Sequence, residues 1–72
     1  MDKNSQFASR ITAVLNRCDG GKSYKWKQAA NDMERVIAEM NTYHPKNPGQ
    51  QLILRQLKRE AESWVYVWRM RA

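Results

Sequence analysis

The sequence has very little cysteine and histidine, the residues that stabilise many small proteins through disulfides or bound metal ions. Its 72 residues include one cysteine, Cys18, and one histidine, His44. A single cysteine excludes an intramolecular disulfide, and these two residues together cannot supply the four ligands of a structural zinc site. We therefore expect no metal and no other cofactor. A chain this short buries little apolar surface, so its stability should depend on a well-packed core or on association with a partner.

Long hydrophobic runs are also absent. The longest apolar run, Trp64 to Trp68, is far short of the roughly 20 residues that span a bilayer. The polar start, Met1 to Gln6, does not lead into the apolar stretch of a secretory signal. We expect a cytoplasmic protein. The aromatic and basic end could rest on an anionic membrane surface, but Glu60 and Glu62 lie close by and the core needs the tryptophans, so we do not expect a membrane as the partner.

Acidic residues are scarce. Thirteen Lys and Arg face seven Asp and Glu, which gives a net charge of +6 and a pI near 9.9. Such an imbalance favours polyanionic partners. The alternative, that the charge serves only solubility, stays open.

No arrangement of residues indicates catalysis. Gly20 to Ser23 resembles the end of a phosphate-binding loop, but the first glycine that such a loop requires is replaced by Asn16. Cys18 lies on a predicted core stripe at a helix C-terminus, where the helix dipole disfavours a thiolate. His44 is expected to be an exposed turn residue. The carboxylates show no pairing that suggests a pocket, so we predict that the protein is not an enzyme.

The apolar residues predict an all-α fold. In three segments, about 5–18, 24–43 and 48–70, they recur at alternating spacings of three and four, the period of a helix that turns one face toward a core. We find no linker, so residues 1–72 should form a single domain. The expected core stripes are Phe7, Ile11, Val14 and Cys18; Trp26, Ala30, Met33, Ile37 and Met40; and Leu54, Leu57, Ala61, Trp64 and Trp68. Leu15, Ala29, Val36, Ile53 and Val65 flank them.

Local signals mark the ends of these helices. Gly20 and Gly21 should stop the first. Ser23 is a candidate cap for the second, and Pro45 should end it near Thr42 or Tyr43. Before the third helix, Asn47 can cap, Pro48 suits the first turn, and Gln50 has the spacing of a capping box.

Two short connections predict a small antiparallel three-helix domain with a long C-terminal helix. The third helix should be about 35 Å long and the first only about 20 Å. Part of the third helix could therefore project and pair with a second copy, which makes a homodimer one expected state.

An up, down, up arrangement would bring the end of the first helix, the start of the second and the end of the third together. We call the cations gathered there the basic pole: Arg17, Lys22, Lys25, Lys27, Arg69 and Arg71. Basic groups can neutralise phosphates. The leading hypothesis is therefore a nucleic-acid-associated accessory or regulatory factor that contacts DNA or RNA through this pole. Trp26, Trp64 and Trp68 fall on core stripes and are expected to pack there instead of stacking on bases.

The competing hypothesis places binding on the side of the third helix that faces away from the core. We call it the outer face and define it by Leu52, Arg55, Arg59, Tyr66 and Met70. A helix that is apolar on two sides commonly has two neighbours, and Tyr, Met and Arg are enriched at interfaces. This surface would suit a regulator, inhibitor or adaptor that docks on an acidic protein surface. Scattered exposed apolar residues with no role are the alternative.

Overall fold

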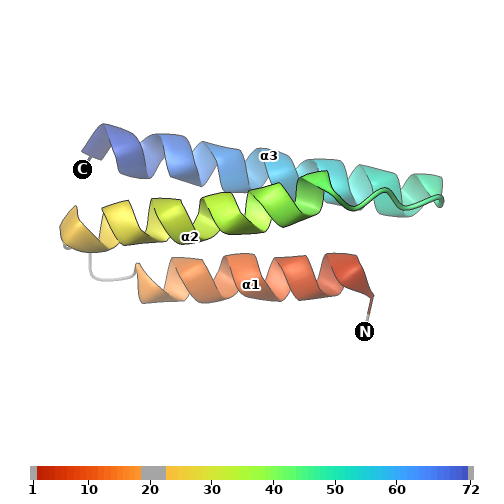
Figure 1. Ribbon diagram of the computed structural model, residues 1–72, viewed down its shortest axis with the longest axis horizontal. Helices are drawn as coiled ribbons and strands as arrows, with labels where there is room; N and C mark the ends of the chain where they lie inside the picture. Colours follow the sequence, from red (N-terminus) through yellow and green to blue (C-terminus); the bar gives the residue numbers. More distant parts are fainter. Residues whose placement is uncertain (1, 19–22, 72) are drawn as a thin grey trace.

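A computed structural model of the chain describes the backbone of residues 2–18 and 23–71 and the side chains of residues 2–18 and 26–71. It contains helices α1 (Lys3–Arg17), α2 (Ser23–Asn41) and α3 (Pro48–Arg71). Successive helices run in opposite directions (Figure 1). The described residues include no strand. The predicted all-α, antiparallel three-helix fold with a long C-terminal helix is confirmed.

In the view of Figure 1, α2 lies between α1 and α3, and each of the three helices also contacts the other two. The molecule measures 39 × 21 × 15 Å along its principal axes. The N-terminal turns of α3 extend past the end of α2, but they do not project freely. The connecting segment runs beside them, and Gln51 Nε2 donates a hydrogen bond to the Pro45 carbonyl at 2.9 Å. No described helix is long and apolar enough to cross a membrane.

Polar side chains fix the start of two helices. Asp2 caps α1, because its Oδ1 accepts a 2.8 Å hydrogen bond from the Ser5 amide. The helix therefore begins two residues before the predicted start at residue 5. At α3, Asn47 Oδ1 accepts from the amides of Gly49 at 2.8 Å and Gln50 at 3.3 Å. The predicted Asn47 cap is confirmed.

The other predicted helix ends differ in detail. α2 ends at Asn41, and the Thr42 and Tyr43 amides then bond to carbonyls three residues back, so the last turn tightens before Pro45. Ser23 is the first residue of α2, but its side chain lies outside the described part, as do Gly20 and Gly21. The capping-box reading of Gln50 was wrong, since its side chain accepts a hydrogen bond from Asn4 of α1.

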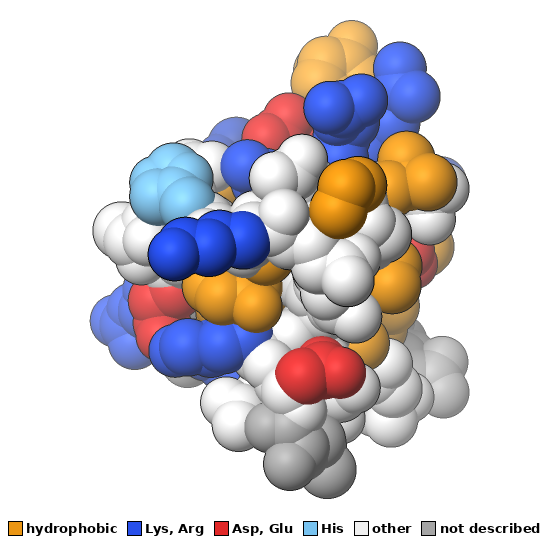
Figure 2. Space-filling model, turned by 90° about the vertical axis from the view of Figure 1, so that its right-hand side faces the viewer, with side chains coloured by type: hydrophobic (Ala, Val, Ile, Leu, Met, Phe, Trp, Pro, Cys, Tyr) orange, Lys and Arg blue, Asp and Glu red, His pale blue; other side chains and the backbone are white. Residues whose placement is uncertain are grey.

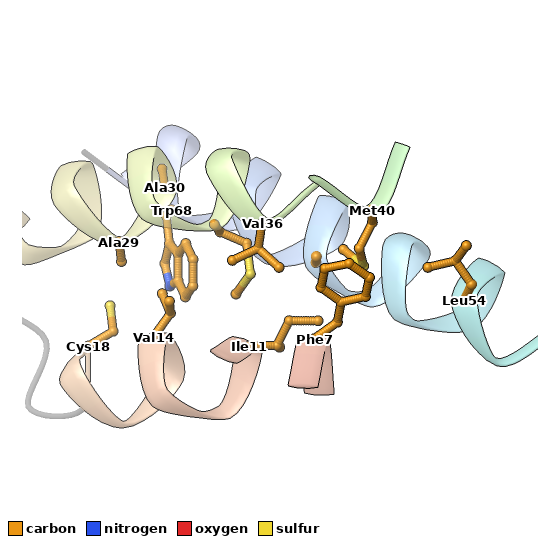
Figure 3. Packing of buried hydrophobic residues seen from close by; sticks show 12 residues of the cluster. Phe7, Ile11, Val14, Cys18, Ala29, Ala30, Val36, Met40, Leu54 and Trp68 are labelled. Atoms are coloured by element: carbon orange, nitrogen blue, oxygen red, sulfur yellow. The ribbon is translucent and has the colours of Figure 1, made fainter. Parts of the chain in front are cut away.

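The core is built from the predicted stripes of all three helices (Figure 3). The Trp68 indole of α3 reaches toward Val14 of α1, with Ala29 and Ala30 of α2 beside it. The small alanine side chains of α2 leave room for the large Trp68 ring, which allows the helices to pack closely here. The buried hydrophobic residues are Phe7, Ile11, Val14, Cys18, Ala29, Ala30, Met33, Val36, Met40, Leu54, Ala61 and Trp68.

Asn4 is a polar residue inside this apolar core, with 2 % of its surface exposed. Its Nδ2 donates to the Gln50 carbonyl at 3.0 Å and to Gln50 Oε1 at 2.6 Å. Its Oδ1 is buried and has no hydrogen-bond partner among the described residues. Asn4 thus ties the first turn of α1 to the first turn of α3, and the sequence pattern had no signal for this contact.

Candidate functional site

The three helix ends that carry the basic pole lie together, as the predicted arrangement requires. The end of α1, the start of α2 and the end of α3 lie at the same end of the molecule (Figure 1). Arg17, Lys27, Arg69 and Arg71 are exposed there. Lys22 and the side chain of Lys25 lie outside the described part, so the structure brings together four of the six predicted pole residues.

Carboxylates of α2 accompany two of these cations. Arg69 Nη2 lies 2.7 Å from Glu34 Oε1, and Arg17 Nη1 lies 3.7 Å from Asp32 Oδ2. The sequence could not show which carboxylates of α2 face α1 and α3. These exposed pairs are weak, but they lower the positive potential that an incoming phosphate would meet.

The two other described pole cations have no ion pair within the described residues. Lys27 is exposed, and the Arg71 guanidinium lies 5.8 Å from the centre of the half-buried Trp26 ring, as in a cation–π contact. Basic residues also occur at the opposite end of the molecule, where Lys3, Lys46 and Arg55 are exposed. The described charge is therefore shared between the two ends.

The outer face of α3 is open along its length. Leu52, Tyr66 and Met70 keep 53 %, 67 % and 69 % of their surface exposed. Arg55 and Arg59 are also exposed, and no carboxylate of the described residues forms an ion pair with either. All five predicted outer-face residues are thus accessible to a partner.

One edge of α3 is less buried than the sequence predicted. Trp64, which we placed on the core stripe, is 37 % exposed, and the flanking Ile53 is 42 % exposed. Trp64 stacks on Trp68, with ring centres 5.7 Å apart. The helical period correctly placed Trp64 beside Trp68. It could not show that Trp68 is buried whereas Trp64 lies at the edge of the buried side of α3.

The ionisable groups with shifted pKa values have structural partners. The pKa of Asp2 is lowered because its carboxylate accepts a hydrogen bond from the Ser5 amide. The pKa of Glu39 is lowered by its hydrogen bond from Arg10 of α1 and by the nearby positive charge. Because both pKa values are lower in the folded state, the two contacts stabilise the fold at neutral pH. This contribution is lost as the pH falls through the folded-state pKa values.

Neither Cys18 nor His44 lies in an arrangement that suggests catalysis. Cys18 is buried in the core, as predicted, and His44 is exposed beyond the end of α2. No three His, Cys, Asp or Glu side chains of the described residues are grouped so that they could hold a metal ion.

Comparison of the chain with known proteins gives no relative. No family model, no curated protein and no solved structure matches it.

Proposed function

We propose that the chain is a non-enzymatic regulator or adaptor that docks on an acidic surface of another protein through the outer face of α3. The observation that carries the proposal is the exposure of Leu52, Tyr66 and Met70 on a face that also presents Arg55 and Arg59, neither of which pairs with a described carboxylate. Aromatic and arginine side chains contribute much of the energy at protein interfaces.

The geometry of this face suits a particular mode of recognition. Leu52 and Met70 lie five helical turns apart, or about 27 Å at 1.5 Å per residue. A helix of this kind can lie in a groove of its partner, with apolar side chains as anchors and cations along the rim. The partner surface should then carry an apolar groove edged by carboxylates, and the net charge of +6 would speed the encounter.

A double substitution, Tyr66→Ser with Met70→Ser, tests this proposal. Both side chains are mostly exposed, so the fold should be retained and the helical circular dichroism unchanged. The immobilised full chain is used to capture proteins from its native host, with quantification by mass spectrometry. We expect an acidic protein whose recovery falls at least tenfold with the double variant, since two lost anchors cost about 2 kcal/mol or more.

Arg35→Gln serves as the control, because Arg35 is an exposed arginine of α2 that does not belong to the outer face. Its variant should capture the same protein as the unmodified chain. Equal recovery by the double variant would overturn the proposal. The solution mass is measured in parallel, and a dimer that the double variant dissociates would identify a second copy as the occupant of the face.

A second candidate function is a nucleic-acid-associated accessory factor that contacts phosphates through the basic pole. The observation in its favour is that Lys27 and Arg71 are exposed at the same end and form no ion pair with a described carboxylate. The ion pairs of Arg17 and Arg69 count against it, so it ranks below the outer face.

Binding to mixed-sequence duplex and single-stranded oligonucleotides across a salt series tests this candidate. Each neutralised phosphate contributes about −0.9 to the slope of log K against log salt for duplex DNA. Replacing both Lys27 and Arg71 with Gln should therefore make the slope shallower by nearly two. Arg35→Gln is again the control. The absence of binding at low salt, or a slope that the double variant leaves unchanged, would reject the pole as the contact surface.

A further inference from the structure

A shallow hollow lies at the α2–α3 connection, at the end of the molecule opposite the basic pole. Its volume is about 260 Å³. Arg55, Lys58 and His44 line it and carry N–H groups, and no carboxylate contributes to the lining. Figure 2 looks onto this end and shows Lys and Arg side chains around the single histidine.

The backbone around the hollow is held in place from both sides. Gln51 Nε2 donates to the Pro45 carbonyl, which fixes the connection against α3. Asn47 caps α3 with two hydrogen bonds to its first turn. The Tyr43 ring contacts the Phe7 ring of α1, with 6.0 Å between centres. His44 follows Tyr43 directly, so the connection that carries it is tied to all three helices.

The cations of this hollow differ from those of the second hollow, which lies between α1 and α2. In the α1–α2 hollow, of about 280 Å³, two of the three lining arginines have internal counterions: Arg10 pairs with Glu39, and Arg17 with Asp32, which itself lines the hollow. At the α2–α3 hollow, Lys58 Nζ donates a hydrogen bond to the neutral Asn41 Oδ1 at 3.5 Å and forms no ion pair with a described carboxylate. Arg55 has no ion pair within the described residues.

From this juxtaposition we propose that the α2–α3 hollow binds a phosphoryl group. Two cations that share a hollow without a carboxylate repel each other, and a bound oxyanion relieves that repulsion. The planar guanidinium of Arg55 can donate two parallel hydrogen bonds to adjacent phosphate oxygens, and Lys58 supplies a mobile point charge. The volume is below the roughly 300 Å³ at which sites for drug-sized ligands begin, which suits a small anion.

Arg55 belongs both to this hollow and to the outer face, but the tests of the two proposals use different residues. Tyr66 and Met70, which the docking test removes, do not line the hollow, and Arg59, one turn beyond Arg55, also lies outside it. Arg59→Gln is therefore a matched control, because it removes one arginine charge from the same helix without touching the lining.

The test is a nuclear magnetic resonance titration of the full chain with inorganic phosphate at constant ionic strength, set by chloride. We expect saturable shifts in residues 43–47 and 51–58, with a dissociation constant of about 1 mM. Replacing both Arg55 and Lys58 with Gln should weaken binding at least tenfold, since both charge-assisted hydrogen bonds to the anion are lost. Arg59→Gln should leave it within about twofold.

Two further probes distinguish the sources of the phosphoryl group. A nucleoside monophosphate carries a terminal phosphate, whereas a short oligonucleotide without terminal phosphates offers only phosphodiesters. Saturation of the hollow by the monophosphate alone would assign it to free phosphate esters, and saturation by the oligonucleotide would assign it to a nucleic-acid backbone. Phosphate shifts that never saturate, or that Arg59→Gln reduces as much as the double variant does, would overturn the proposal.

Discussion

Replacing Trp68 with alanine should remove a large part of the stability of this protein. Trp68 is 3 % exposed and belongs to the buried cluster that joins α1, α2 and α3. Truncating a buried tryptophan to alanine costs about 3 to 5 kcal/mol, because burial is lost and a cavity remains. A domain of 72 residues has a total stability of only about 4 to 11 kcal/mol. Urea unfolding followed by circular dichroism should show a midpoint at a much lower urea concentration than that of the unmodified chain.

Trp64→Ala provides a control in the same helix with the same side-chain change. Trp64 is 37 % exposed, and its main contribution beyond partial burial is its stack on Trp68, worth about 1 kcal/mol. The Trp64 variant should therefore remain folded. Equal losses from the two substitutions would show that α3 is not oriented with Trp68 inward and Trp64 at the edge.

Asn4→Asp should have the second largest effect. The Asn4 Nδ2 group donates to two oxygens of Gln50 in a buried position. The substitution replaces this donor with a carboxylate oxygen, which leaves a buried negative charge beside two acceptors. An uncompensated buried charge costs about 3 kcal/mol or more. The dipole of α1 favours a carboxylate in its first turn by less than about 1 kcal/mol, so it cannot offset the loss.

The pH dependence separates this effect from simple loss of a contact. Burial should raise the pKa of the introduced carboxyl above its unfolded value of about 3.9. The penalty is then complete above the raised pKa and disappears as the pH falls below the unfolded value, where the carboxyl is protonated in both states. Chemical unfolding of Asn4→Asp and Asn4→Ala is compared with the unmodified chain between neutral and acidic pH. A gap between the two variants that does not narrow in acid would contradict the burial of this side chain.

Short-range signals in the sequence predicted the helices well. The 3.6-residue period identified all three, and Asn47 with Pro48 marked the start of α3 correctly. The N-terminus of α1 was missed because the apolar stripe begins only at Phe7. Asp2 is nevertheless three residues before Ser5, which is the spacing between a capping side chain and the amide that donates to it. Local rules of this kind need no knowledge of how the helices pack.

Features that depend on packing could not be predicted in the same way. Whether Trp64 is buried depends on where α3 turns away from its neighbours, and the pairing of Glu39 with Arg10 depends on how α1 lies against α2. The α2–α3 hollow was missed for a related reason. His44 was judged alone as a turn residue, whereas Arg55 and Lys58 approach it only because α3 folds back along α2.

The central claim, that the outer face of α3 contacts an acidic protein, is tested most directly by photo-crosslinking in the native host. A photoreactive phenylalanine derivative replaces Tyr66 in the full chain, and in the control it replaces Ala38, an exposed residue of α2. The proposal predicts a crosslinked acidic protein from position 66 and little or none from position 38. Equal crosslinking from both positions, or crosslinks to nucleic acid alone, would contradict it.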